Sequence, residues 1–186
     1  MSRLSCDGPS AVSVRIESIM LMNPSVLSVL DQVMDAHGTA IGDAQLFEPE
    51  SGLLEMIAWR GVSDEAVMGK DGLGEVGGGG WKWVDPRRDT TVCCRAFRSG
   101  NALYISDVVN DAPYAPYLAA TLASGIRAIH SIPVLVDGRC VAVVSPMYAA
   151  PRVLPLNALE QSRRIMARAG DWIPASALRV PLAFAK

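Results

Sequence analysis

Apolar positions in the first half of the chain recur at two different spacings. In NPSVLSVLDQVMDAHG an apolar residue returns every three or four positions, which predicts an amphipathic helix ended by Gly38. AIGDAQLFE and LLEMIAWRG are short apolar stretches joined by the turn formers PESG, which predicts an antiparallel hairpin. SDEAVMG predicts a short helix capped by Ser63. Upstream, VSVRIESIML fits either a short strand or the first turns of a helix, and we favour the helix.

The second half continues with the same two periodicities. TTVCCRAFRSG predicts a helix capped by Thr90 or Thr91, and ALYISDV predicts a strand. LAATLAS predicts a helix closed by Gly125. IRAIHSIPVLV and RCVAVVSPM predict a second hairpin around Asp137-Gly138, and LPLNALEQSRRIMARAGDWI predicts a last helix.

A long interruption separates the two halves. Residues 70–89 hold six glycines and a proline without sustained periodicity, which predicts a loop rather than an element. Long loops in compact domains are commonly functional, so we expect a lid that is mobile without ligand. Hairpins on both sides of this loop favour an α+β fold with an antiparallel sheet, and not a doubly wound parallel one.

Composition and charge exclude several classes of protein. The 186 residues fit one globular domain, and a net charge of −2 with scattered basic residues argues against nucleic acid as a partner. The N-terminus lacks the apolar core of a signal peptide and no apolar run approaches membrane length, so we expect a cytoplasmic chain without membrane contact. The four cysteines show no zinc spacing and no disulfide scaffold, which predicts reduced thiols.

Three phrases in this order resemble a GAF domain over residues 24–170. They are DAQLFEPESGLLEMIAWRG, CCRAFRSGNALYISDVVNDAPYAP and GIRAIHSIPVLVDGRCVAVVS. The resemblance leaves residues 1–23 as an N-terminal extension and residues 171–186 as a C-terminal tail.

The resemblance implies a three-layer α/β/α fold in which five or six antiparallel strands are flanked by helices. The first and last helices would lie on one face, and a pocket roofed by residues 70–95 and 110–123 on the other. GAF domains bind cyclic nucleotides, bilins, haem, small metabolites or nothing known, so the family does not name the ligand. With the lid tryptophans as the foremost candidates, the expected ligand-binding residues are Trp81, Trp83, Cys93, Asp107, Tyr114, His130, Ser145 and Met147.

Two adjacent cysteines raise the question of thiol chemistry. Cys93 and Cys94 lie near a helix N-terminus, where backbone N–H groups favour a thiolate. The free methionine-R-sulfoxide reductases, enzymes of this fold, also have a cysteine there, but they carry a second essential cysteine after the third strand that this sequence lacks. We therefore expect Cys93 to be a small residue packed under the pocket or core, with no catalytic residue, and keep a thiol redox enzyme or redox sensor as the alternative.

Other candidate chemistry is weaker. A single histidine in a strand, His130, is more often hydrogen-bonded structure than a haem or metal ligand, and LAATLASG has no cysteine for a bilin, so we expect no metal and no cofactor. The glycine-rich loop lacks a P-loop ending. Asp43, Asp107 and Asp111 have no companion base in sequence, so we expect surface or turn positions rather than acid–base roles.

The sequence therefore predicts a stand-alone sensor domain that binds a small-molecule ligand. Without an output domain after it, signalling would pass to a separate protein or through a homodimer formed by the first and last helices. The last helix has apolar positions for this contact, among them Leu156, Leu159, Ile165 and Met166. A scaffold used only for protein interaction is the third possibility.

Overall fold

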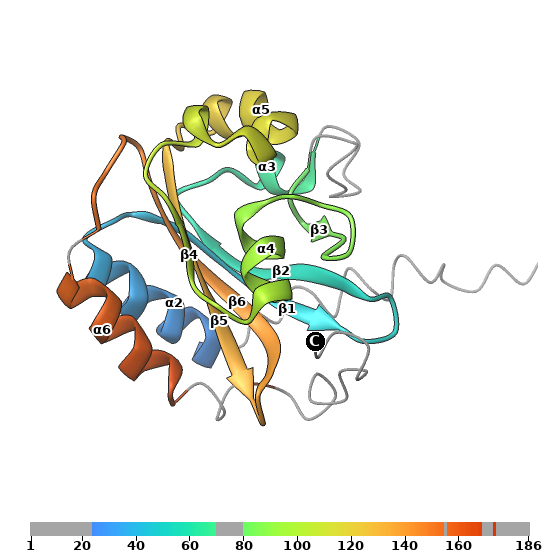
Figure 1. The fold of residues 1–186 in the computed structure, drawn as a ribbon, viewed down its shortest axis with the longest axis vertical. Helices are drawn as coiled ribbons and strands as arrows, with labels where there is room; N and C mark the ends of the chain where they lie inside the picture. The colour runs from blue at the N-terminus through green and yellow to red at the C-terminus, as the bar shows by residue number, and fades with distance from the viewer. Residues whose placement is uncertain (1–23, 70–79, 155, 169–172, 174–186) are drawn as a thin grey trace, which may run out of the picture.

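The computed structural model describes residues 24–69, 80–154, 156–168 and 173 (Figure 1). The predicted N-terminal extension with its helix, most of the C-terminal tail, and residues 70–79 of the predicted lid lie outside the described residues.

Five α-helices and six strands make up the described part of the chain, with two 3-10 helices, η2 and η3. In chain order they are α2 (Pro24–His37), β1 (Ile41–Glu48), β2 (Leu53–Arg60), α3 (Asp64–Met68), β3 (Trp83–Val84), α4 (Val92–Ser99), β4 (Leu103–Ile105), η2 (Val108–Asn110), η3 (Ala112–Tyr117), α5 (Leu118–Ala123), β5 (Ala128–Val136), β6 (Arg139–Tyr148) and α6 (Leu156–Met166).

The six strands form one antiparallel sheet in the order β3-β2-β1-β6-β5-β4. Both predicted hairpins are present, and the second turns through Asp137 and Gly138 with φ of 51° and 74°. This pair of left-handed residues is what a two-residue hairpin needs to match the twist of its strands. The predicted α+β class and antiparallel sheet are confirmed.

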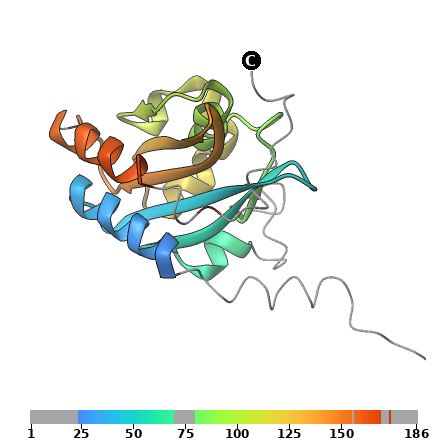
Figure 2. The ribbon, with the colours of Figure 1, turned by 90° about the horizontal axis from the view of Figure 1, so that it is seen from below.

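Helices cover both faces of the sheet. Helices α2 and α6 contact each other on one face, and α4 and α5 lie over the other (Figures 1 and 2). Strand β1 shows why both faces are apolar: Gly42 faces Met34 of α2, whereas Phe47 stacks on Phe97 of α4 with 5.0 Å between ring centroids. Alternate residues of one central strand thus pack into two different layers, as the three-layer prediction requires.

The predicted loop is wrong at Trp83–Val84, which form a short strand, whereas the other residues of 80–89 have no helix or strand. Here β3 pairs with β2, and the side chain of Lys82 is 0 % exposed, with its ammonium bonded to the Met56 carbonyl and 3.1 Å from Glu55 Oε1. The ammonium also lies 5.6 and 5.8 Å from the ring centroids of Trp59 and Trp83. This buried cation attaches the segment to β2, a contact that local periodicity does not reveal.

Two further elements differ from the predictions. Strand β4 ends at Ile105, and the chain continues into η2 instead of extending through Asp107. In α6 the buried residues are Ala158 and Ser162, whereas Leu156, which we placed on the apolar face, is 85 % exposed. Leucine at the first position of the helix lies beyond the area that α2 and the sheet cover.

Candidate functional site

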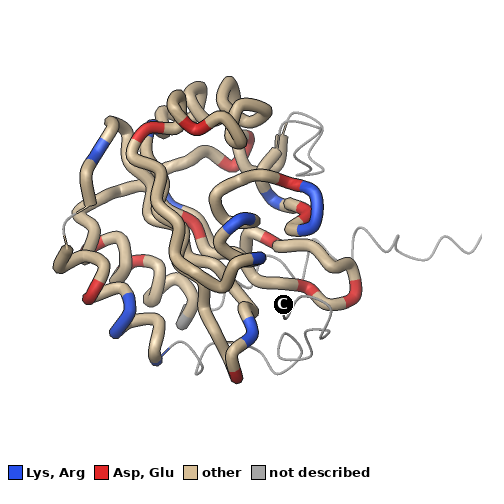
Figure 3. Tube along the Cα trace, viewed as in Figure 1, with Lys and Arg blue, Asp and Glu red and all other residues tan. Residues whose placement is uncertain are grey.

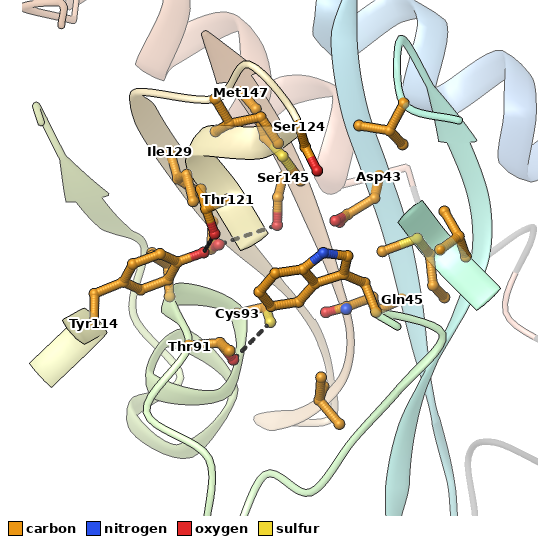
Figure 4. A pocket seen from close by; sticks show the side chains of 18 residues that line it. Asp43, Gln45, Thr91, Cys93, Tyr114, Thr121, Ser124, Ile129, Ser145 and Met147 are labelled. Atoms are coloured by element: carbon orange, nitrogen blue, oxygen red, sulfur yellow. Dashed lines mark hydrogen bonds between the residues drawn. The ribbon is translucent and has the colours of Figure 1, made fainter. Parts of the chain in front are cut away.

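A cavity lies between the sheet and the layer that contains α3, α4, η3 and α5 (Figure 4). Its volume is about 60 Å³, well below the roughly 300–1,000 Å³ of sites for drug-sized ligands. It is lined by Asp43, Gln45, Met56, Val62, Val67, Trp81, Val84, Thr91, Val92, Cys93, Tyr114, Thr121, Ser124, Ile126, Ile129, Ser131, Ser145 and Met147.

The sheet supplies a polar floor in an otherwise apolar cavity. Asp43 and Gln45 stand two positions apart on β1 and reach into the same space (Figure 4), and they are only 4 % and 2 % exposed. Ser145 of β6 hydrogen-bonds to the Asp43 carboxyl group, and its hydroxyl lies 3.0 Å from that of Ser131 on β5. Within the part of the chain that the structure describes, Asp43 Oδ1 and Gln45 Oε1 have no hydrogen-bond partner.

Asp43 is the clearest correction to the sequence analysis. We predicted a surface or turn position, but the residue lies in the middle of the central strand β1 and lines the cavity. Burial raises the pKa of its carboxyl group well above the ordinary value, and the nearby Cys93 thiol raises it further, against a hydrogen bond from Ser145. A carboxyl group in this position is held in the protonated form more readily than one in water.

The first turn of α4 brings the two thiols to different surroundings. Thr91 caps the helix by accepting a hydrogen bond from Cys94 N, and its hydroxyl lies 3.1 Å from Cys93 Sγ. Cys93 is half-buried and lines the cavity, whereas Cys94 is fully buried in the hydrophobic core.

The same difference appears in the pKa values of the two thiols. Hydrogen bonds from the Cys94 thiol, and then from Thr91 and Gln45, lower the pKa of Cys93 despite burial. The bond to Cys93, together with burial, raises the pKa of Cys94. Of these two thiols, only Cys93 combines a place at the cavity with a pKa below its ordinary value.

The far wall is aromatic. Tyr114 of η3 is buried, and its hydroxyl lies 3.0 Å from Thr121 Oγ1 of α5 (Figure 4). Burial raises the pKa of Tyr114, so the phenol stays neutral. The ring of Trp81 packs beside Tyr117, with 6.0 Å between centroids. These contacts position the roof against the floor formed by β1, β5 and β6.

Five of the eight expected ligand-binding residues line this cavity, which agrees with the expected position on the face away from α2 and α6. They are Trp81, Cys93, Tyr114, Ser145 and Met147. Whether they contact a ligand stays a prediction.

Trp83 and Asp107 lie elsewhere. Trp83 is half-buried, and its ring contacts the Lys82 ammonium instead of the cavity. Asp107 caps η2 by accepting from Val109 N and pairs with Arg127 at 2.7 Å, which lowers the pKa of its carboxyl group. We expected Asp107 both at a turn and among the ligand-binding residues. The structure places it at a turn and outside the cavity.

His130 is on the opposite face of the sheet, because its neighbour Ser131 faces the cavity and side chains alternate along a strand. Its ring lies 5.2 Å from that of His37 on α2, and its Nδ1 has no hydrogen-bond partner. His37 itself bonds to Tyr148 and Ser162 at 2.5 and 2.7 Å. The histidines therefore belong to the contact between α2, α6 and the sheet.

Asp43, Gln45 and Ser131 were missed as site residues. The signal that could have found them is a polar side chain repeated at two-residue spacing in an apolar strand that the fold buries on both faces.

Neither a metal centre nor a membrane span is found among the described residues. No group of three His, Cys, Asp or Glu side chains there could hold a metal ion. No helix in those same residues has the length and apolar character that crossing a bilayer requires.

An antiparallel six-stranded sheet with helices on both faces and a cavity against one of them makes this an α+β domain with the GAF-like fold. The sequence profile of the GAF domain matches residues 25–172, and the chain therefore belongs to the GAF domain family. A comparison with curated proteins gives no match.

Solved structures with the same fold are distant in sequence. A GAF domain/HD domain protein from Geobacter sulfurreducens is 10 % identical with a TM-score of 0.61, covering 88 % of this chain and 94 % of its own. A methyl-accepting chemotaxis protein, residues 122 to 287, is 16 % identical with a TM-score of 0.59, covering 90 % and 94 %. The type II free methionine-R-sulfoxide reductase from Thermoplasma acidophilum is 11 % identical with a TM-score of 0.58, covering 86 % and 92 %. At these identities the likeness concerns the fold alone.

Proposed function

We propose that this GAF domain is a sensor that binds a small molecule in the cavity and performs no chemistry on it. The observation that carries the proposal is the pair of buried acceptors, Asp43 Oδ1 and Gln45 Oε1: both belong to residues that line the cavity, and neither has a hydrogen-bond partner among the described residues. A buried polar atom without a hydrogen bond costs about 1–3 kcal/mol, and a ligand that donates to these atoms recovers that free energy. A purely structural scaffold would gain by filling the same space with apolar side chains.

The route from ligand to partner is proposed to run through α2 and α6, which pack side by side across the sheet from the cavity (Figure 2). The apolar residues Leu159, Ile165 and Met166 of α6 are half-buried rather than free for a partner. What these helices expose is charged: Asp31 and Asp35 on α2, and arginines on α6 (Figure 3). We therefore propose a homodimer or partner contact at this face that depends on charge as well as on the exposed Leu156.

Native mass spectrometry of freshly purified protein tests the first proposal. We expect a small-molecule adduct on the wild-type chain that is lost in Met147→Trp, which adds bulk at the cavity wall, and kept in Met147→Leu, which conserves volume. Circular dichroism checks that both variants fold. An adduct that survives in the folded Met147→Trp variant would place the ligand elsewhere.

Sedimentation tests the second proposal. A dimer at tens of micromolar protein that weakens with added salt supports a charged contact, because exposed ion pairs are screened. A chain that sediments as a monomer at every salt concentration contradicts the homodimer and leaves only the contact with a separate partner.

One observation favours a second function, a thiol redox activity: Cys93 lines the cavity and has a lowered pKa. Reduction of a sulfoxide consumes two electrons and leaves a sulfenic acid on the attacking thiol, so turnover needs a second thiol, from the chain or from solution, that forms a disulfide with it and releases water. Cys94 is a poor candidate, because adjacent residues have Cα atoms about 3.8 Å apart, less than the roughly 4.4–6.8 Å of ordinary disulfides.

We therefore expect Cys93→Ser to leave ligand binding nearly intact and the wild type to show no thiol-dependent reduction of free methionine sulfoxide. Steady turnover by the wild type that is lost in Cys93→Ser, and kept in Cys140→Ser, would establish the redox function instead.

A further inference from the structure

The ionisable side chains that line the cavity are all acidic. Among the described lining residues these are the Asp43 carboxyl, the Cys93 thiol and the Tyr114 phenol, and none is Lys, Arg or His. No basic side chain there is placed to neutralise an anionic ligand. Burying an anion beside the Asp43 carboxylate would add like charges in a medium that screens them poorly, and it would raise the pKa of Asp43 further.

Once Asp43 is a carboxylate, the two unpartnered atoms at the cavity are both acceptors. Among the described residues, Gln45 Oε1 and Asp43 Oδ1 have no hydrogen-bond partner, and Ser145 hydrogen-bonds to the Asp43 carboxyl group. Residues two apart on a strand lie about 7 Å from each other at Cα and point the same way. Two acceptors on one face at that spacing suit a group with several N–H donors.

The remainder of the cavity is apolar and aromatic. Val67, Val84, Ile129 and Met147 surround the polar floor, and Trp81 lines the same space. An indole ring attracts a cation through its π face, most strongly where water is excluded. A carboxyl group, an amide carbonyl and an indole around one small space form a set of groups that favours a positively charged nitrogen.

From these observations we propose that the cavity binds a small aliphatic amine. Its ammonium group donates to Asp43 Oδ1 and Gln45 Oε1, and its short apolar body packs against the valines, Ile129 and Met147. The volume of about 60 Å³ limits the ligand to a few heavy atoms unless the roof opens. This inference rests on the proposed ligand-binding function and adds the class of ligand to it.

Binding should be linked to a proton. Burial favours the neutral Asp43 carboxyl group in the empty cavity, whereas an ammonium ion beside it favours the carboxylate. The Asp43 proton then passes to water as the amine enters, so affinity should rise with pH, by up to tenfold per pH unit. The other titratable groups that face Asp43 are Cys93 from α4 and Tyr114 from η3, and burial keeps the phenol neutral.

Three probes with the same isobutyl body separate the possibilities: isobutylamine, isobutanol and isovalerate, titrated at millimolar concentration into ¹⁵N-labelled protein and followed by amide chemical shifts. We expect the amine to bind at least tenfold more tightly than the alcohol at pH 7.5, and isovalerate to shift no cavity amide. Asp43→Asn should abolish the preference for the amine. The matched control Asp107→Asn alters a carboxylate outside the cavity and should leave it unchanged.

Different results test the amine proposal and the proposed ligand-binding function. Equal binding of amine and alcohol, or tighter binding of isovalerate, overturns the amine proposal and keeps the sensor proposal. A cavity that takes none of the three probes, in a protein without a co-purified adduct, counts against both. If Asp43→Asn does not fold, the wild-type titration between pH 5.5 and 8 decides, since an amine affinity that stays constant over that range overturns the proposal.

Discussion

Two buried histidines should make the stability of this domain fall steeply in mild acid. His37 and His130 lie between the sheet and the helices α2 and α6, and both are nearly inaccessible to solvent. Burial lowers the pKa of each to about 4; the charge of Arg152 contributes at His37, and the charge of His37 contributes at His130. Tyr148, Tyr104 and Ser162 are their other polar neighbours, and none of these is an acid that could hold an imidazolium.

The direction and the magnitude of this pH dependence follow from the difference in proton binding between the folded and the unfolded chain. Because the folded pKa lies below the ordinary value of 6.5, the unfolded chain binds more protons between pH 6.5 and pH 4. Stability is therefore full above pH 6.5, is lost as the pH falls, and levels off below pH 4. Each histidine taken alone accounts for about 2 kcal/mol at pH 5 and about 3 kcal/mol at pH 4.

The two histidines should nevertheless respond differently to replacement by phenylalanine. Ser162 donates its hydroxyl to the Ala158 carbonyl, so it accepts from His37 Nε2, and Nδ1 accepts from Tyr148. Removing His37 takes away the acceptor of the Tyr148 hydroxyl and the donor to the Ser162 oxygen, and should cost about 2–3 kcal/mol at pH 7. His130→Phe removes a ring whose Nδ1 has no partner, so its cost at pH 7 should stay within about 1 kcal/mol.

Urea unfolding followed by tryptophan fluorescence at pH 7.5, 6, 5 and 4 measures both effects. Differences between variant and wild type remove the contribution of carboxylates elsewhere in the chain. We expect His130→Phe to be near wild type at pH 7.5 and about 2 kcal/mol more stable at pH 5. A difference between His130→Phe and wild type that does not change with pH would refute the reasoning, because it would mean that His130 titrates alike in the folded and unfolded chain.

Two other predictions concern stability. A Cβ on Gly61, whose φ is +71°, would lie 2.4 Å from the Ala40 carbonyl oxygen, so Gly61→Ala should lower the free energy of unfolding in urea by roughly 2–4 kcal/mol. Gly138 has a similar φ of +74° but open space around it, so the control Gly138→Ala should cost about 1 kcal/mol. Equal costs for the two variants would contradict the steric argument. Lys82→Met keeps the buried aliphatic stem but leaves Glu55 without its partner, so we expect the free energy of unfolding to fall by roughly 2–3 kcal/mol in the same assay. Glu55→Gln should cost less, because the Glu55 side chain is partly exposed. A Lys82→Met variant as stable as the wild type would show that the buried charge does not contribute to stability.

The elements that the sequence predicted are those whose signals are local. Helix α4 carries its own cap at Thr91 and its own terminator, Gly100, in the left-handed conformation. The Asp137-Gly138 turn likewise specifies its hairpin within two residues. Strand β3 has only two residues, and its reason to form is pairing with β2 and burial of Lys82 under Trp59, which are contacts across more than twenty positions of sequence. A window of periodicity cannot detect them.

The residues that line the cavity were predicted in part: Ser145 and Met147 of β6 line it as expected, Trp83 does not, and Asp43 and Gln45 of β1 were missed. The family resemblance placed Cys93 and Tyr114 in the layer over the cavity, where the structure has them, because their positions follow from the order of the elements. His130 was misplaced, since a strand that is apolar on both faces hides which residues point to which side, and a register change of one position moves every side chain across the sheet. Asp43 was dismissed because a carboxylate in sequence looks solvent-exposed until the layer above it is known.

The two faces of the sheet differ in the hydrogen-bond partners of their buried polar groups. On the side of α2, both nitrogens of His37 are bonded, and the one atom of the histidine pair that lacks a partner among the described residues, His130 Nδ1, belongs to a residue that does not line the cavity. On the side of α4, Asp43 and Gln45 are equally buried, yet each keeps one acceptor without a partner, and the two acceptors face one cavity. Unpartnered polar atoms are tolerated in a stable core only at a cost of about 1–3 kcal/mol each. Two such atoms on neighbouring residues at one cavity can be satisfied by a ligand that donates hydrogen bonds to them. We therefore propose that this face binds the ligand and that the face covered by α2 and α6 contributes stability.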